Sequence, residues 1–153
     1  MSTVSLTLDE IFDLAKKTLL ANGCDDETAS TLSDLIRNAE RDGSLSHGLF
    51  RLPAYVSGLK SGKINGKGKP EVQKVSPSVI KVKGNNCLAP VVLSKGLPEL
   101  AKAAKENGVA VLAINNSHHM AAMWPETEKL AEEGLVAFAC TSYKPAVAPA
   151  GAI

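Results

Sequence analysis

A helical stretch that ends at a glycine and leads into a short apolar run occurs twice in the second half of the chain. The two glycines are Gly108 and Gly134, and a glycine is the usual residue just after a helix end. Apolar runs follow over residues 109–114 and 135–140. Alternating helices and buried strands are typical of βαβ crossovers, which pair their strands in parallel. The pattern therefore predicts an α/β fold in which these two strands pair in parallel.

Further strand and helix signals lie on either side of this pattern. Residues 71–83 show the alternation of strands, broken by Pro77. Helices are predicted over residues 90–107 and 124–133, the second with Pro125 in its first turn. Parallel sheets need both faces covered, and two parallel strands make a poor sheet alone. We therefore expect this chain to be the N-terminal part of a longer protein.

The first 62 residues have the periodicity of helices. Apolar positions at helical spacing predict helices over residues 7–22 and 26–41, and a third over about 46–59 that Pro53 either kinks or restarts. Thr7 and Glu10 form a capping-box pattern before the first helix. The sequence thus predicts an N-terminal helical segment before the α/β part.

Composition excludes several classes of function. The formal net charge of +1 gives no electrostatic basis for binding nucleic acid or anionic membranes. The three cysteines are far apart and form neither a metal-binding pair nor a disulfide framework. No apolar run reaches membrane-spanning length, and the N-terminus lacks the pattern of a signal peptide. We expect a soluble cytoplasmic protein that acts on a small molecule.

One candidate site is the motif Ser46-His47-Gly48 with Arg51 four residues after the histidine. On a helix, His47 and Arg51 would lie on the same face. Histidine exchanges protons near neutral pH, and arginine offers a planar fork to a carboxylate. These groups suit the reduction of a small 2-keto or 2-imino acid. A surface histidine and arginine, with Ser46 as an N-cap, is the alternative, and on the residues alone it is the more common arrangement.

A second candidate site follows the predicted strand 109–114, at the strand end where α/β proteins bind ligands. It runs from Asn116 to Trp124 and contains two adjacent histidines and two adjacent alanines. Small side chains let a backbone approach a ligand closely, and the helix that follows offers free N–H groups to a phosphate. A zinc site is disfavoured because no Cys, Asp or Glu lies close by in sequence. Lys144, after the next strand, is either a ligand for an anion or a solvated lysine.

Three segments resemble the signatures of the malate/L-lactate dehydrogenase family of NAD(P)-dependent oxidoreductases. They are residues 42–62 with Ser46-His47-Gly48, then Asn116-Ser117-x-His119, then Val147-Ala148-Pro149-x-Gly151. No G-x-G-x-x-G follows a strand, in keeping with that family's own, non-Rossmann cofactor fold. The resemblance implies an N-terminal helical segment, residues 1–62, followed by the start of a non-Rossmann NAD(P)-binding α/β domain, residues 63–153. Ser142 departs from the asparagine of many members.

Within that family, residues 118–125 are most similar to the Δ1-piperideine-2-carboxylate/Δ1-pyrroline-2-carboxylate reductases, which use NADPH. The resemblance implies Ser46 as a charge-relay residue, His47 as the proton donor and Arg51 as the ligand of the substrate carboxylate. The residues implied to line the cofactor are His119, Met120, Ala121, Ala122 and Met123. Other members are thought to use the position of His119 as the acid/base. The resemblance also implies a homodimer.

Two alternatives to an NADPH-dependent imino-acid reductase stay open at this point. The first is a 2-hydroxyacid dehydrogenase of the same family that acts on malate, lactate or ureidoglycolate with NAD and NADH. The second is an inactive piece of the family fold that serves only as a binding or assembly module. No anchor for the 2′-phosphate of NADPH is identifiable in this stretch.

Overall fold

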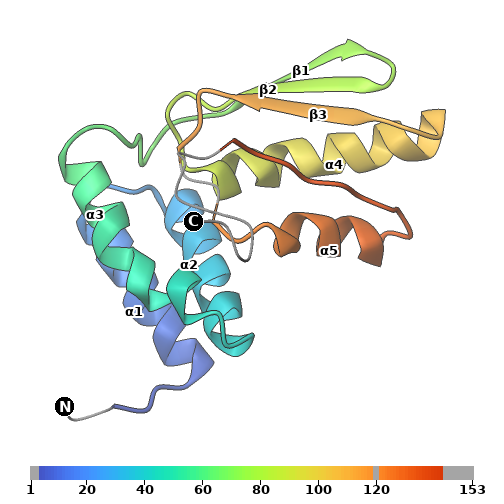
Figure 1. Ribbon diagram of the computed structural model, residues 1–153. Coiled ribbons are helices and arrows are strands. Elements are labelled where there is room, and N and C mark those ends of the chain that lie inside the picture. The colour runs from blue at the N-terminus through green and yellow to red at the C-terminus, as the bar shows by residue number, and fades with distance from the viewer. Residues whose placement is uncertain (1–3, 119–120, 143–153) are drawn as a thin grey trace, which may run out of the picture.

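The computed structural model describes residues 4–118 and 121–142. A three-stranded sheet carries two helices on one face, and three further helices pack at one end of this layered part (Figure 1). The helices are α1 (Leu8–Ala21), α2 (Asp26–Arg41), α3 (Leu52–Lys60), α4 (Ala89–Asn107) and α5 (Trp124–Glu132). The strands are β1 (Glu71–Ser76), β2 (Val79–Lys83) and β3 (Val111–Asn115). The α/β layering predicted from the sequence is confirmed.

The first two helices begin where their capping residues predict. Thr7 accepts the backbone N–H of Glu10, and the Glu10 carboxylate accepts the backbone N–H of Thr7, so the capping box is present. Asp25 caps α2 by accepting the N–H of Thr28 at 2.9 Å. The predicted helices 7–22 and 26–41 are confirmed as α1 and α2.

The third predicted helix, over residues 46–59, is correct only in its second half. Two 3₁₀ turns, Leu45–His47 and Leu49–Arg51, precede α3, and Pro53 lies in the first turn of α3, so the helix restarts at Pro53 and is not kinked there. Gly48 separates the turns, with φ −86° and ψ −138°. A side chain at Gly48 would collide with the Glu40 carboxylate, which accepts the N–H of Leu49. This contact from α2 breaks the helical path before α3.

The sheet combines an antiparallel and a parallel pair. β1 and β2 form a hairpin around Pro77, where the sequence pattern breaks, and β2 pairs in parallel with β3 through the crossover helix α4. Val79 lies opposite Val111, and Lys83 lies opposite Asn115. A βαβ unit is therefore present, but its strands are β2 and β3 and not the pair predicted from the glycine pattern.

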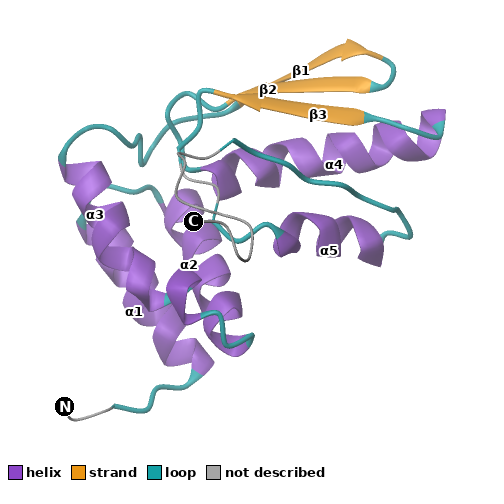
Figure 2. Ribbon diagram, in the orientation of Figure 1, coloured by secondary structure: helices purple, strands orange, loops and turns teal. Residues whose placement is uncertain are grey.

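The predicted strand 135–140 is wrong as a strand. Its side chains alternate between half-buried and exposed, and Leu135 and Ala137 pack against the same buried cluster on α4 and α5 as Leu112 and Ile114 of β3. The segment runs back from α5 as an extended loop (Figure 2). Within the described residues no strand pairs with it by backbone hydrogen bonds. The apolar pattern of residues 135–140 indicates which side chains face the interior. A strand also needs hydrogen bonds to a partner strand, and the pattern does not predict these.

One hydrophobic core joins the helical segment and the α/β part. Leu19, Leu32 and Ile36 of the N-terminal helices are fully buried together with Val82 of β2 and Val92 of α4. Because α2 packs on α4, the turns between α2 and α3 are held at a fixed place relative to the sheet. The division into domains at residues 62 and 63 stays a prediction.

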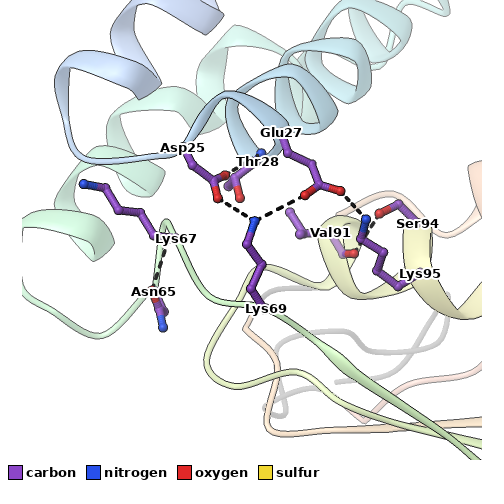
Figure 3. A network of polar contacts seen from close by, with 9 residues as sticks. All are labelled: Asp25, Glu27, Thr28, Asn65, Lys67, Lys69, Val91, Ser94 and Lys95. Atoms are coloured by element: carbon purple, nitrogen blue, oxygen red, sulfur yellow. Dashed lines mark hydrogen bonds and ion pairs between the residues drawn. The ribbon is translucent and has the colours of Figure 1, made fainter.

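An ion-pair network reinforces this junction (Figure 3). Lys69, just before β1, contacts Asp25 at 2.9 Å and Glu27 at 3.3 Å, and Lys95 of α4 also pairs with Glu27. The start of α2, the chain before β1 and helix α4 are thereby tied together. Partial burial acts to raise the pKa of the Asp25 carboxyl, but the hydrogen bonds from Lys69 and Thr28 outweigh it and lower the pKa to about 2.

We expect Asp25→Asn to lower the free energy of unfolding by about 1–2 kcal/mol at neutral pH, because asparagine keeps the cap but removes the charge. The Asp25 pKa falls on folding, so this stability is present above the ordinary value of 3.8 and is lost as the pH drops toward about 2. Denaturant unfolding at a series of pH values measures it. Asp26→Asn is the control, since that side chain is 75% exposed beside Lys16 and should cost less than about 0.5 kcal/mol. Equal losses in the two variants would contradict the prediction.

Candidate active site

His47 is held by two serine hydroxyls at one ring nitrogen. It ends the 3₁₀ turn Leu45–His47, and its Nδ1 lies 3.0 Å from Oγ of Ser46 and 3.2 Å from Oγ of Ser44. A hydroxyl that donates to Nδ1 fixes the neutral tautomer that carries its proton on Nε2. In the described structure, the assigned hydrogen bonds of the ring are all at Nδ1, so Nε2 is the nitrogen that can face a substrate.

The surroundings of His47 disfavour its charged form. Burial is the main cause of a lowered pKa of the imidazole, and the positive charge of Arg51 adds to it. A histidine with a pKa below the ordinary value of 6.5 gives up its proton readily near neutral pH. The site therefore suits transfer of a proton to or from a bound molecule.

Arg51 lies in the next 3₁₀ turn and is oriented by the backbone. Its Nε–H donates to the carbonyl oxygen of Ser46 at 2.7 Å, which is its one assigned hydrogen bond within the described residues. The Nη groups at the end of the guanidinium are then available to bind a carboxylate. The sequence predicts that Ser46, His47 and Arg51 act together, and this geometry is consistent with that prediction. The three residues lie in two consecutive 3₁₀ turns, however, and not on one face of a helix.

Trp124 connects this turn to the second candidate site. The centroid of its ring lies 6.1 Å from that of His47, with an angle of 77° between the ring planes. Trp124 begins α5, immediately after the alanine-containing segment that was predicted to bind cofactor. Two motifs more than 70 residues apart in the sequence therefore meet at the His47 ring.

The chain between β3 and α5 is fixed by its backbone. Asn116 has a φ of 56°, and its carbonyl accepts the N–H of Asn86 at 2.9 Å. The N–H of His118 donates to Cys87 at 2.9 Å, and its carbonyl accepts from Ala89 at 2.8 Å. These bonds extend the parallel alignment of β2 and β3 beyond the sheet, so the residues after β3 start from a defined position.

Only part of the predicted cofactor segment lies within the described residues. Ala121 and Ala122 are buried and Met123 is half-buried, whereas His119 and Met120 lie outside the described residues. The third motif, including Lys144, also lies outside them, and Ser142 is exposed. The small buried side chains next to Trp124 fit the close approach of a flat ring to the backbone beside His47.

The first turn of α5 does not fit the phosphate that the sequence suggested there. Glu126 occupies this turn, its Oε2 is buried without a hydrogen-bond partner among the described residues, and burial raises the pKa of its carboxyl. A phosphate at this helix end would meet a buried acid that competes for the same N–H groups. The fit to a nicotinamide cofactor thus rests on Ala121, Ala122 and Met123 and not on the end of α5.

Sequence reasoning missed Ser44 and Glu40, and it missed the contact between Trp124 and His47. Ser44 is the second hydroxyl at His47, and its position three residues before the histidine is a local signal that could have found it. The Glu40 carboxylate accepts the N–H of Leu49 from nine residues away, and Trp124 touches His47 across a long sequence separation. No local pattern reports those contacts.

Residues 4–118 and 121–142 contain no group of three or more His, Cys, Asp or Glu side chains that could hold a metal ion. The helices in these ranges are too short or too polar to cross a membrane.

Comparison with known proteins identifies the family. Residues 6–153 match the family described as malate/L-lactate dehydrogenase. The chain belongs to this family. The resemblance seen in the three sequence segments is thereby confirmed.

Members of the malate/L-lactate dehydrogenase family with similar sequences include reductases and dehydrogenases. A Δ1-pyrroline-2-carboxylate/Δ1-piperideine-2-carboxylate reductase of Pseudomonas syringae pv. tomato is 39% identical over 98% of this chain and 44% of its own length. A malate/(S)-sulfolactate dehydrogenase of Methanothermus fervidus is 34% identical over 94% of this chain and 42% of its own length. The chain therefore spans less than half the length of these relatives.

Solved structures show the same fold. The crystal structure of Δ1-piperideine-2-carboxylate reductase from Pseudomonas syringae aligns with a TM-score of 0.83 and 39% identity, over 86% of this chain and 40% of that one. Malate dehydrogenase from Pyrococcus horikoshii aligns with a TM-score of 0.80 and 30% identity, over 86% of this chain and 38% of that one. The predicted fold of the family's N-terminal part is confirmed.

Proposed function

We propose that the protein is an NADPH-dependent reductase of cyclic imino acids, which converts Δ1-piperideine-2-carboxylate or Δ1-pyrroline-2-carboxylate to L-pipecolate or L-proline. The observation that carries the proposal is the turn in which the serine hydroxyls hold His47 Nδ1 and Arg51 lies beside it. Support also comes from the Pseudomonas relative, which is named as such a reductase. The protein is then an oxidoreductase that acts on a C=N bond.

The residues of this chain divide the reaction between binding and proton transfer. Arg51 binds the substrate carboxylate, and its contact with the Ser46 carbonyl fixes the direction of the guanidinium. A bound nicotinamide cofactor supplies the hydride that reduces the imine carbon. In its protonated form His47 gives the Nε2 proton to the imine nitrogen and is left as the neutral imidazole, so that one hydride and one proton complete the C–H and N–H bonds. Ser44 and Ser46 stabilise the imidazole from Nδ1 and relay charge to it.

The cofactor is proposed to lie along residues 119–123. Ala121, Ala122 and Met123 are the described members of this set, and His119 and Met120 complete it. The support is that the segment ends at Trp124, which contacts His47. We propose NADPH rather than NADH from the subgroup resemblance. A homodimer is proposed from the family resemblance, and a cytoplasmic location from the cysteine usage and the sequence of the N-terminus.

A second candidate is a 2-hydroxyacid dehydrogenase with the same residues. The Methanothermus relative, at 34% identity, is a malate/(S)-sulfolactate dehydrogenase, and Arg51 would bind a 2-keto acid as well as a 2-imino acid. In that case the acid/base is His47 or His119.

We expect the purified protein to reduce Δ1-piperideine-2-carboxylate with NADPH at a kcat/KM at least about a hundredfold above that for pyruvate or oxaloacetate. Oxidation of NADPH or NADH, followed by absorbance for each pair of substrate and cofactor, measures the ratio. A preference for a 2-keto acid with NADH would replace the proposal by the dehydrogenase. Absence of both turnover and cofactor binding in a folded protein would favour the binding or assembly module.

A further inference from the structure

The single tryptophan of the chain lies against the candidate proton donor. Trp124 is the first residue of α5, and its ring meets the His47 ring in an edge-to-face arrangement with a centroid separation of 6.1 Å. This separation is within the range in which aromatic pairs attract each other. The imidazole is therefore held in two ways, by hydroxyl contacts at Nδ1 and by the ring contact.

The indole of Trp124 is itself anchored. Its N–H interacts with the carboxylate of Asp42, the C-cap residue of α2. Arg41 binds the same carboxylate through Nε at 2.7 Å and Nη2 at 3.1 Å. The hydrogen bonds from Arg41, with a smaller contribution from Trp124, lower the pKa of Asp42, so this carboxylate is charged at neutral pH.

We propose that Trp124 is a positioning residue for His47, held against the imidazole by the Asp42 carboxylate. The proposal rests on the role given to His47 in the proposed function. Residues 121–123 immediately precede Trp124, so the same ring fixes the proton donor relative to the cofactor-binding segment. The end of α2, the turn of His47 and the start of α5 then form one unit, although they are far apart in sequence.

The proposal makes a prediction about the titration of His47. Burial is the main cause of its lowered pKa, and Trp124 supplies ring surface that excludes water from the imidazole. The charged groups in or next to this cluster are Glu40, Arg41, Asp42, Arg51 and Glu128. All of them are retained when the indole is removed. A change in the pKa of His47 in that variant therefore reports the loss of the ring contact.

We expect Trp124→Ala to raise the pKa of His47 toward 6.5, measured by NMR of its ring protons and assigned with His47→Gln. Trp124→Phe keeps a ring and should shift this pKa less. In the unchanged protein, tryptophan fluorescence should show a transition at the same pH, because a protonated imidazole quenches a nearby indole. The transition should be absent in His47→Gln. Both readouts are independent of enzyme activity.

The kinetic counterpart is a selective effect on kcat. Trp124→Ala should lower kcat by about ten- to a hundredfold, since a small displacement of a catalytic group is costly, with little change in the KM for the imino acid because Arg51 is intact. Trp124→Phe should recover most of the loss. Phe12→Leu removes another aromatic ring, one that contacts Arg37 on the N-terminal helices, and should leave both constants unchanged.

The outcomes separate this proposal from the proposed function. An unchanged His47 pKa in Trp124→Ala, or no fluorescence transition in the unchanged protein, overturns the contact whatever the activity is. A shifted pKa with unchanged kcat overturns the positioning role. If His47→Ala is itself fully active, the proposed function fails, and the NMR result still decides the contact. Should Trp124→Ala not fold, Asp42→Asn is used instead. A weaker pH transition of the tryptophan fluorescence in Asp42→Asn supports the role of Asp42 in holding Trp124 against His47. An unchanged transition overturns that role.

Discussion

In the variant His47→Ala, turnover of the imino acid is expected to fall by about 10²–10⁴-fold, the usual contribution of a positioned general acid. The affinity for NADPH should stay the same, because the proposed cofactor segment lies elsewhere, at residues 119–123. Steady-state kinetics give the first quantity, and quenching or enhancement of NADPH fluorescence on titration gives the second. Loss of NADPH binding in a folded His47→Ala protein would contradict the assigned role.

A matched histidine is available as the control. His118 is also half-buried, and it is held by backbone hydrogen bonds to Cys87 and Ala89 that do not involve its ring. His118→Gln should therefore retain turnover. A loss of activity as large as that of His47→Ala would show that the assay reports general damage near the site and not proton transfer.

The pH dependence should carry the signature of His47. To donate a proton the imidazole must be protonated, and the protonated fraction falls as the pH rises through its pKa. Burial and Arg51 place this pKa below 6.5, so kcat/KM for reduction should increase as the pH is lowered from alkaline to mildly acidic values. In His47→Gln this dependence should disappear apart from any titration of the substrate.

The parts of the fold that were predictable have local causes. Thr7 with Glu10 starts α1 by two hydrogen bonds within four residues, and Gly108, with a φ of 80°, ends α4 where the sequence places the end. Such signals are complete within one turn of the chain, so one sequence is enough to find them. The motif Ser46-His47-Gly48 was found in the same way, through the chemistry of neighbouring residues.

The parts that were missed depend on tertiary contacts. The helix expected over residues 46–59 is interrupted because Glu40 of α2 reaches the turn at Gly48. Residues 135–140 have the side-chain pattern of a strand, yet pairing requires a neighbour that the pattern cannot supply. Trp124 meets His47 only because α2 and α5 both pack beside α4. The sequence therefore indicated which residues carry chemistry better than how they are brought together.

Arg51→Lys is expected to raise the KM for the imino acid by about ten- to a hundredfold, because lysine lacks the two-pronged donor that matches a carboxylate. Lysine also loses the Nε–H bond to the Ser46 carbonyl that aims the guanidinium. Since His47 and its serines are untouched, kcat should fall much less than KM rises. The control is Arg37→Lys, which changes an arginine paired with Asp34 on the surface of α2 and should leave KM unchanged.

A neutral substrate analogue isolates the carboxylate. The carboxamide of the same cyclic imine has no charge for Arg51 to bind, so it should be a poor substrate for the unchanged protein and almost equally poor for Arg51→Lys. The two changes, one in the protein and one in the substrate, should therefore be strongly non-additive. Additive effects would mean that Arg51 supports the turn through Ser46 without touching the substrate, and the carboxylate would then be bound by another group.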